Sequence, residues 1–249
     1  MLSPGWWNKK VLLLSCFTLA GAVLLSSVFL LKLLCHSLMM ELNLLISMLD
    51  LVGVAVFAAS GSLVASRKEM DIVGFTLMAT LTGIGGGTLR DLILDRPVFW
   101  ITDQRYLVVC FGVAVLVFFT AHKLQKRYVA LLWADAVGLS AFGVMGAHIA
   151  MKSGASPLAS IAFGVMTATF GGLARDIAAG EKPLLLQPEV YVTAALFAAG
   201  SYLGLTYAGL AQVFAVFIAI LVGFLIRAGG IALGWALPRY KGRAGRDYG

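Results

Sequence analysis

The chain has 249 residues, of which 60% are hydrophobic and 12% charged, and its formal net charge is +7. Soluble domains carry about 25% charged residues, so this composition excludes an ordinary soluble protein and predicts an integral membrane protein. The cations lie in short loops and in the tail, which is typical of topology signals and not of a basic face that binds nucleic acid.

Eight apolar stretches are long enough to be membrane helices, each of which needs about 20 residues. The uncharged run Val190–Ile226 is too long for one crossing, so we divide it near the turn sequence TYAGL. In chain order, the predicted helices are 11–34, 43–65, 72–95, 105–121, 128–150, 155–179, 189–206 and 209–227.

Residues 1–38 form an extension before the core. Their apolar run exceeds the h-region of a signal peptide and no A-x-A cleavage site follows, so an uncleaved membrane anchor fits better. Lys9 and Lys10 before this run agree with a cytoplasmic N-terminus. The alternative is a translation start at Met39 or Met40, which would leave seven helices.

Loop cations predict the orientation of the core helices. One side of the membrane receives Arg67, Lys68, Lys123, Lys126, Arg127, Lys182, Arg239, Lys241, Arg243 and Arg246. The other side receives chiefly Arg96, Arg105 and Lys152. By the positive-inside rule, the first side is cytoplasmic and includes the C-terminus.

The sequence repeats itself, without a gap, after 85 residues. LDLVGVAVFAASGSLVA (49–65) aligns with ADAVGLSAFGVMGAHIA (134–150), and GGGTLRD (85–91) aligns with FGGLARD (170–176). Each copy contains three predicted crossings, an odd number, so the second copy must insert upside down. Inverted repeats with glycine-interrupted helices at corresponding positions indicate a transport site near the membrane midplane.

The predicted fold class is therefore an all-α integral membrane protein with seven core transmembrane helices. They form two inverted three-helix repeats plus one helix, and the N-terminal extension adds a candidate eighth. The predicted domains are the extension 1–38, the repeats 43–127 and 128–208, the seventh core helix 209–237 and a basic cytoplasmic tail 238–249.

Glycines interrupt the same helix of each repeat, at Gly85, Gly86 and Gly87 and again at Gly171 and Gly172. Each glycine destabilises a helix by about 1 kcal/mol relative to alanine, so we expect both helices to kink or break. Irregular backbone at membrane depth must be buried in protein or line a water-filled cavity. The glycines therefore predict that these two helices bend where water or ions can reach them.

Charged residues follow the glycines within one helical turn, at Arg90, Asp91, Arg175 and Asp176. An intramembrane charge costs at least about 2.5–3.5 kcal/mol, so such residues pair or face a cavity. Depth along the helices predicts the pairs Asp50–Arg90 and Asp135–Arg175, at opposite mouths of one pathway. The alternative is that these pairs only hold the fold together.

Phe57 and Phe142 lie on the glycine-bearing face of their helices and are candidates for a gate, although simple aromatic packing is the alternative. His148, alone on an apolar helix, is interpreted as a packed neutral histidine. The three cysteines form no CxxC pair and lack clustered histidines, so we expect neither a metal site nor a disulfide framework.

The segments TGIGGGTLRDLILDRPVFW, DAVGLSAFGVMGAH and FGGLARDI resemble the bacterial homologues of the trimeric intracellular cation (TRIC) channels, whose tandem domain is also labelled glycine transporter. The resemblance covers roughly residues 43–237. It implies a homotrimer in the lipids of the bacterial inner membrane, with a pore in each protomer. It also implies permeation of monovalent cations, K⁺ before Na⁺, without a required cofactor, and with the glycine motifs as kinks beside the pore. Phe170 replaces a frequent third glycine, so we expect it to stiffen the second kink or narrow the pathway.

An enzyme is not expected, because GIGGGTLRD lacks the G-K-[ST] ending of a P-loop and no nucleophile, base and orienting acid are gathered. A channel is the first hypothesis, in which the carboxylates offset the arginines. A secondary transporter of a small solute such as glycine is the second, and a scaffold without a permeant is the third. The charges lie nearer the mouths than the midplane, which favours the channel.

Overall fold

The computed structural model describes residues 46–123, 127–187 and 189–238. Apart from residues 46 and 47, all of them belong to one compact unit, Met48–Gly249. The predicted N-terminal helix 11–34 lies outside the described residues, as does the basic tail after residue 238.

The described chain is helical, and seven helices correspond to the predicted core, which confirms the fold class. Six are long and apolar enough to cross a membrane. They are Ile46–Arg67, α2 (Ile72–Ile93), α4 (Arg105–Thr120) with the 3-10 turn η1 (Ala121–Lys123), α5 (Arg127–Lys152), α6 (Pro157–Ala178) and α8 (Gln212–Leu233). The seventh, α7 (Val192–Tyr207), is apolar but shorter, and the loops after α2 and α6 contain α3 (Phe99–Thr102) and η2 (Leu184–Leu186).

Helix ends agree with the predictions within a few residues, with one exception. The prediction ended the last helix at residue 227, but α8 continues to Leu233. Helix α8 continues past Arg227, whose buried guanidinium is partly compensated. Its Nη1 donates to Glu189 at 2.8 Å and the group lies over the Tyr191 ring, whereas its Nε and Nη2 have no hydrogen-bond partner in the described chain. The predicted division of the long apolar run is confirmed, since Gly209 takes a positive φ of 82° between α7 and α8.

The two repeats begin their second helix in the same way. The Asp71 carboxylate caps α2 by accepting from the backbone N–H of Gly74 at 2.8 Å. At the equivalent position, the Ser156 hydroxyl caps α6 by accepting from the backbone N–H of Ala159 at 3.4 Å. A short polar side chain at this position satisfies a backbone donor that the first helical turn leaves unpaired.

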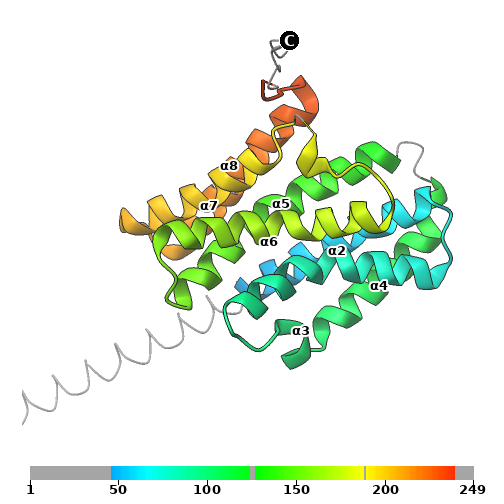
Figure 1. Ribbon diagram of the computed structural model, residues 1–249, viewed down its shortest axis with the longest axis horizontal. Coiled ribbons are helices and arrows are strands. Elements are labelled where there is room, and N and C mark those ends of the chain that lie inside the picture. The colour runs from blue at the N-terminus through cyan, green and yellow to red at the C-terminus, as the bar shows by residue number, and fades with distance from the viewer. Residues whose placement is uncertain (1–45, 124–126, 188, 239–249) are drawn as a thin grey trace, which may run out of the picture. The chain divides into compact units, whose positions relative to one another are not determined.

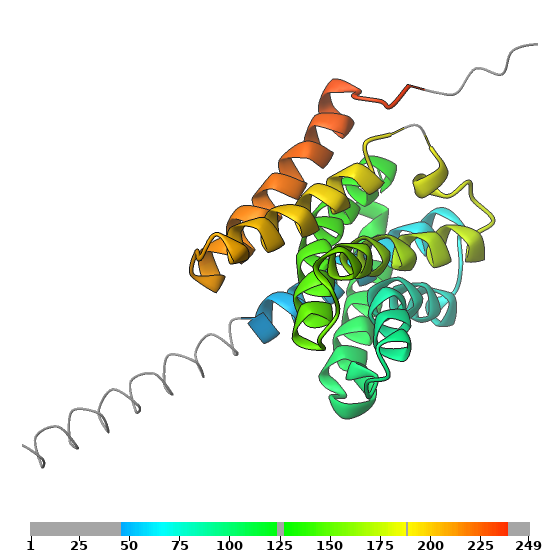
Figure 2. The ribbon, with the colours of Figure 1, turned by 60° about the vertical axis from the view of Figure 1, so that its left-hand side comes forward.

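Helices α2 and α6 form the centre of the bundle and pack against each other (Figure 1). Helix α4 packs on α2, whereas α5 and α7 pack on α6. Figure 2 shows α7 and α8 side by side, and both also contact α5. Alanines and Tyr202 fill the core between these last three helices.

The α2–α6 crossing depends on glycine. A Cβ atom on Gly86 would collide with the carbonyl oxygen of Thr167, and a Cβ on Gly171 would collide with the carbonyl oxygen of Thr82. Since the later glycine of each helix meets the earlier threonine of the other, the helices cross antiparallel. Both run without interruption through their glycine motifs.

The predicted break in these helices is therefore wrong, whereas a milder kink stays a prediction. Close packing between the two backbones compensates the intrinsic cost of glycine, as small residues commonly do where membrane helices cross. The motifs bring two inverted helices into contact at their midpoints.

Candidate functional site

Two clusters of equivalent residues flank the α2–α6 crossing. The first-repeat cluster comprises Asp50, Arg90, Asp91, Phe99 and Tyr106. The second-repeat cluster comprises Asp135, Arg175, Asp176, Leu184 and Tyr191, each 85 positions later. Each arginine follows the crossing glycine of its own helix by one turn, so the antiparallel crossing puts the clusters on opposite sides of it.

The clusters share one backbone arrangement. Arg90 Nε donates to Asp91 Oδ1 at 2.8 Å, and Arg175 Nε donates to Asp176 Oδ1 at 2.8 Å. The other oxygen of each carboxylate accepts from a loop backbone N–H. Asp91 Oδ2 binds Phe99 at 3.0 Å, and Asp176 Oδ2 binds the equivalent Leu184 at 2.9 Å. Each aspartate thus joins its arginine to the loop that follows.

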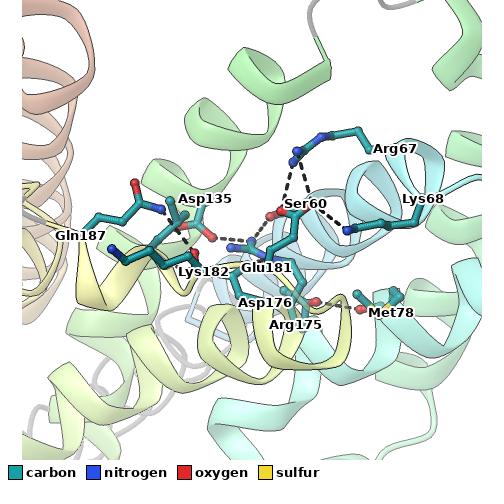
Figure 3. Close-up of polar contacts among 12 residues, drawn as sticks. Ser60, Arg67, Lys68, Met78, Asp135, Arg175, Asp176, Glu181, Lys182 and Gln187 are labelled. Atoms are coloured by element: carbon teal, nitrogen blue, oxygen red, sulfur yellow. Dashed lines mark hydrogen bonds and ion pairs between the residues drawn. The ribbon is translucent and has the colours of Figure 1, made fainter.

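In the second-repeat cluster, Arg175 Nη1 donates to Asp135 Oδ1 at 2.7 Å, which confirms this predicted pair. The same nitrogen donates to the hydroxyl of Ser60 on the first described helix. Figure 3 shows these three side chains converging from three helices. Both members of the ion pair are 0% exposed. The carboxylates of Asp135 and Asp176 therefore take the place of the water that would surround Arg175 at a surface.

In the first-repeat cluster, the predicted pair Asp50–Arg90 is wrong: within the described residues, the ion pair of Arg90 is with Asp91. Asp50 instead accepts a hydrogen bond from the Tyr106 hydroxyl at 2.7 Å. Two sequence differences between the repeats accompany this. The position of Ser60 is taken by Met145 in the second repeat, and the Arg90 guanidinium lies over the ring of Phe99, 5.8 Å from its centre.

Three of the six buried side-chain atoms that lack a hydrogen-bond partner in the described chain lie in the second-repeat cluster, and the others are Thr193 Oγ1 and the Nε and Nη2 of Arg227. Oδ2 of Asp135, Nη2 of Arg175 and the Tyr191 hydroxyl are all buried and have no hydrogen-bond partner in the described part of the chain. Two of them lie beside Gly172: a Cβ there would lie 2.8 Å from the Tyr191 oxygen and 3.5 Å from the Arg175 nitrogen. Because unpaired buried polar groups are costly, this cluster calls for a polar partner such as water.

A polar cavity of about 400 Å³ adjoins this cluster through Asp176. Its other lining residues include Arg67, Tyr128, Glu181 and Lys182. Glu181 forms ion pairs with Arg67 at 3.2 Å and with Lys68 at 3.6 Å, as Figure 3 shows. The cavity therefore continues from the second-repeat cluster toward the side on which the sequence predicts the cytoplasm.

The two predicted gate residues lie against each other. The rings of Phe57 and Phe142 are stacked, with centres 5.1 Å apart, and both are buried. Each also packs on a glycine of the partner helix, Gly138 and Gly53 respectively. This contact agrees with the packing alternative, and a gating role stays a prediction.

The remaining glycine-motif residues have separate environments. Gly85 approaches the Cα of Gly171 at the crossing, and Gly87 lies beneath the ring of Phe99. Phe170 lines an apolar groove of about 390 Å³ along α2. A role for Phe170 in narrowing a pathway stays a prediction.

His148 is buried as predicted, but it is not without polar contacts. Its Nδ1 lies 2.6 Å from the Tyr202 hydroxyl. No group of three or more acidic, cysteine or histidine side chains that could hold a metal occurs within residues 46–123, 127–187 and 189–238.

Sequence reasoning gave no role to four residues that shape the clusters, namely Ser60, Phe99, Tyr106 and Tyr191. The two tyrosines align at the 85-residue spacing and could have been assigned from that alignment. The serine and the phenylalanine break the repeat, so the alignment contained no signal for them.

Known proteins match this chain over nearly the whole core. The family model described as "Glycine transporter" matches twice, at residues 47–122 and 132–207. The second match begins and ends 85 residues after the first, which confirms the internal repeat. The UPF0126 inner membrane protein YadS of Escherichia coli is 40% identical over 156 residues, covering 61% of this chain and 74% of YadS. A UPF0126 membrane protein of Vibrio cholerae is 37% identical and covers 79% and 83%.

Solved structures agree in fold. The TRIC trimeric intracellular cation channel orthologue from Rhodobacter sphaeroides is 49% identical, with a TM-score of 0.75, covering 77% of this chain and 99% of the orthologue. A prokaryotic TRIC channel in 0.5 M KCl is 30% identical, with a TM-score of 0.73, covering 78% and 100%. This protein is thus a multi-pass inner-membrane protein with the TRIC fold and belongs to the TRIC channel family, in the UPF0126 group with tandem glycine-transporter domains, rather than to a family of enzymes.

Proposed function

We propose that the protein is a K⁺-permeable channel that works as a homotrimer, with a pore in each protomer and its C-terminus in the cytoplasm. Its similarity to solved proteins named as TRIC cation channels, at 30–49% identity, supports the channel class. Loop cations support the orientation. The surrounding lipids would contact the large exposed apolar side chains of α4 and α8, such as Val108, Phe111, Phe214 and Leu221.

One observation carries the proposal: three buried polar atoms without partners gather at the interface of the two repeats. A pathway filled with water would satisfy Oδ2 of Asp135, Nη2 of Arg175 and the Tyr191 hydroxyl at once. The adjoining polar cavity of about 400 Å³ gives this water a continuation away from the crossing. Carboxylate and carbonyl oxygens suit hard cations such as K⁺.

The test is recording from purified protein in planar bilayers under a KCl gradient. Discrete unitary currents that reverse near the K⁺ equilibrium potential are expected. Asp135→Asn should lower the K⁺ conductance several-fold, because it removes a carboxylate from the pathway while leaving Arg175 charged. Asp71→Asn is the matched control, since the exposed Asp71 only caps α2 and asparagine caps equally well. Absence of currents from properly folded protein would refute the channel.

A secondary transporter of a zwitterion such as glycine is the second candidate, and one observation favours it. Asp135 and Arg175 hold a carboxylate and a guanidinium together, each with an atom unpaired in the described chain. The ammonium and carboxylate of an amino acid have the complementary charges. Saturable, counter-ion-dependent glycine uptake by proteoliposomes that pass no unitary current would favour this function over the channel. A scaffold predicts neither result.

A further inference from the structure

Phe99 and Leu184 occupy equivalent positions, and their backbones are held in the same way. Both donate a backbone N–H to the carboxylate of the aspartate that follows the arginine. The side chains differ: one is an aromatic ring on the four-residue helix α3, and the other an aliphatic chain in η2. A difference in polarity or hydrogen bonding between the two clusters can therefore be assigned to the side chains of Phe99 and Leu184.

The Phe99 ring fills the space over Gly87. A Cβ on Gly87 would lie 2.5 Å from the edge of this ring. The same ring meets Tyr106 edge-on, with centres 4.6 Å apart, and lies under the Arg90 guanidinium. It thus lies between the backbone of α2 at Gly87 and the side chains of Tyr106 and Arg90.

The equivalent space over Gly172 has polar walls. Its nearest neighbours are the Tyr191 hydroxyl, Arg175 Nη2 and Asp135 Oδ1, and no atom of Leu184 is among them. In this cluster three polar atoms lack partners, whereas no side-chain atom of the first-repeat cluster is among the unpaired atoms of the described residues. The space over Gly87 is thus filled by an apolar ring and its cluster has no unpaired side-chain atom in the described chain, whereas the space over Gly172 is lined by polar atoms, two of them unpaired.

We infer that Phe99 is a gate that closes the pathway at the first-repeat cluster by packing over Gly87. Opening moves the ring away from Gly87, exposes Arg90 and Tyr106 to water, and frees Asp50 to pair with Arg90. The pairing of aspartate with arginine then matches the one that the second-repeat cluster already has, although that pair is buried. Each repeat shows one of the two arrangements.

The hydrogen bonds that hold α3 in place do not involve the Phe99 ring, so the ring can move while α3 stays fixed. The Trp100 indole N–H donates to the Thr88 hydroxyl at 2.9 Å, and the Phe99 backbone N–H binds Asp91. The hydrogen bond to Asp91 can persist while the ring rotates about its own side-chain bonds, so opening needs no rearrangement of α2. The gate is therefore a side-chain movement on a fixed loop.

Two experiments test this gate. The first, single-channel recording, rests on the proposed channel function. Phe99→Ala should shift the closed–open equilibrium toward open roughly tenfold, since the ring's apolar contacts stabilise only the closed state. Leu184→Ala, at the equivalent position, is the matched control and should change the equilibrium less than about twofold. Phe99→Leu, which installs the residue of the second repeat, should open the gate to a smaller extent and guards against misfolding of the alanine variant.

A labelling experiment tests the gate without any current. Tyr106→Cys, in a background without the three native cysteines, places a thiol behind the Phe99 ring. A membrane-impermeant, charged thiol reagent should modify it roughly tenfold faster when Phe99→Ala is added, and no faster when Leu184→Ala is added. If the protein passes no current but labelling accelerates, the proposed channel fails and the gate stands. If currents and labelling are both unchanged in the Phe99 variants, or if Leu184→Ala has the same effect, the gate is overturned.

Discussion

Replacing Gly171 by alanine should separate the two central helices. The new Cβ would overlap the carbonyl oxygen of Thr82, which belongs to the backbone and cannot rotate away. Overpacking of this kind costs about 1–3 kcal/mol. Alanine also favours the helix by about 1 kcal/mol relative to glycine, so the net loss of stability is smaller than the collision alone implies.

Gly204→Ala on α7 is the matched control because a Cβ at Gly204 meets nothing within 4 Å. Both variants gain the same helix propensity, so the difference between their unfolding free energies isolates the collision, about 1–3 kcal/mol. Denaturant unfolding in detergent micelles, followed by tryptophan fluorescence, measures this difference. Equal stability of the two variants would refute the role assigned to the crossing.

Gly86→Ala meets Thr167 in the same way and should cost a similar amount. The double variant with Gly171→Ala should cost less than the sum, because helices separated by one collision have already accommodated the other.

Two further predictions concern the charged clusters. Asp135→Asn should destabilise the protein by about 1–3 kcal/mol, because Arg175 loses one of its two carboxylates and keeps Asp176; an unchanged denaturation midpoint would contradict this. Met145→Ser should give Arg90 a hydroxyl partner equivalent to the one that Ser60 gives Arg175. This partner should favour pairing of Arg90 with Asp50, so the coupling energy in a double-mutant cycle between these two residues should rise toward about 0.5–3 kcal/mol. The same cycle in the Met145 protein is the reference, and equal coupling in both would contradict the explanation given for the missing ion pair.

Hydropathy and the internal repeat predict the fold well because each helix needs a continuous apolar run, and inversion follows from an odd number of crossings. The pair Asp135–Arg175 is predictable for the same reason, since depth in the membrane and the cost of an unpaired charge leave few partners. Repeat symmetry wrongly transfers that pair to Asp50 and Arg90. Single differences within the aligned segments, such as Met145 at the position of Ser60, break this symmetry.

The prediction of a helix break at the glycine runs differs most from the structure, in which both helices are continuous. Intrinsic helix propensity predicts a break at Gly85–Gly87, but propensity does not include the partner helix, which only the three-dimensional structure supplies. Phe99 could not be assigned from the sequence either, because in RPVFW it is one of several apolar loop residues. Its role depends on a glycine twelve positions earlier on a different element.

The carboxylates of Asp91 and Asp176 have a mechanical consequence. Each carboxylate binds an arginine with one oxygen and the backbone of the following loop with the other. A solute or ion that displaces one of these loops would therefore also displace the arginine bound to the same carboxylate. Each aspartate thus couples the position of a loop to the position of an arginine next to the α2–α6 crossing.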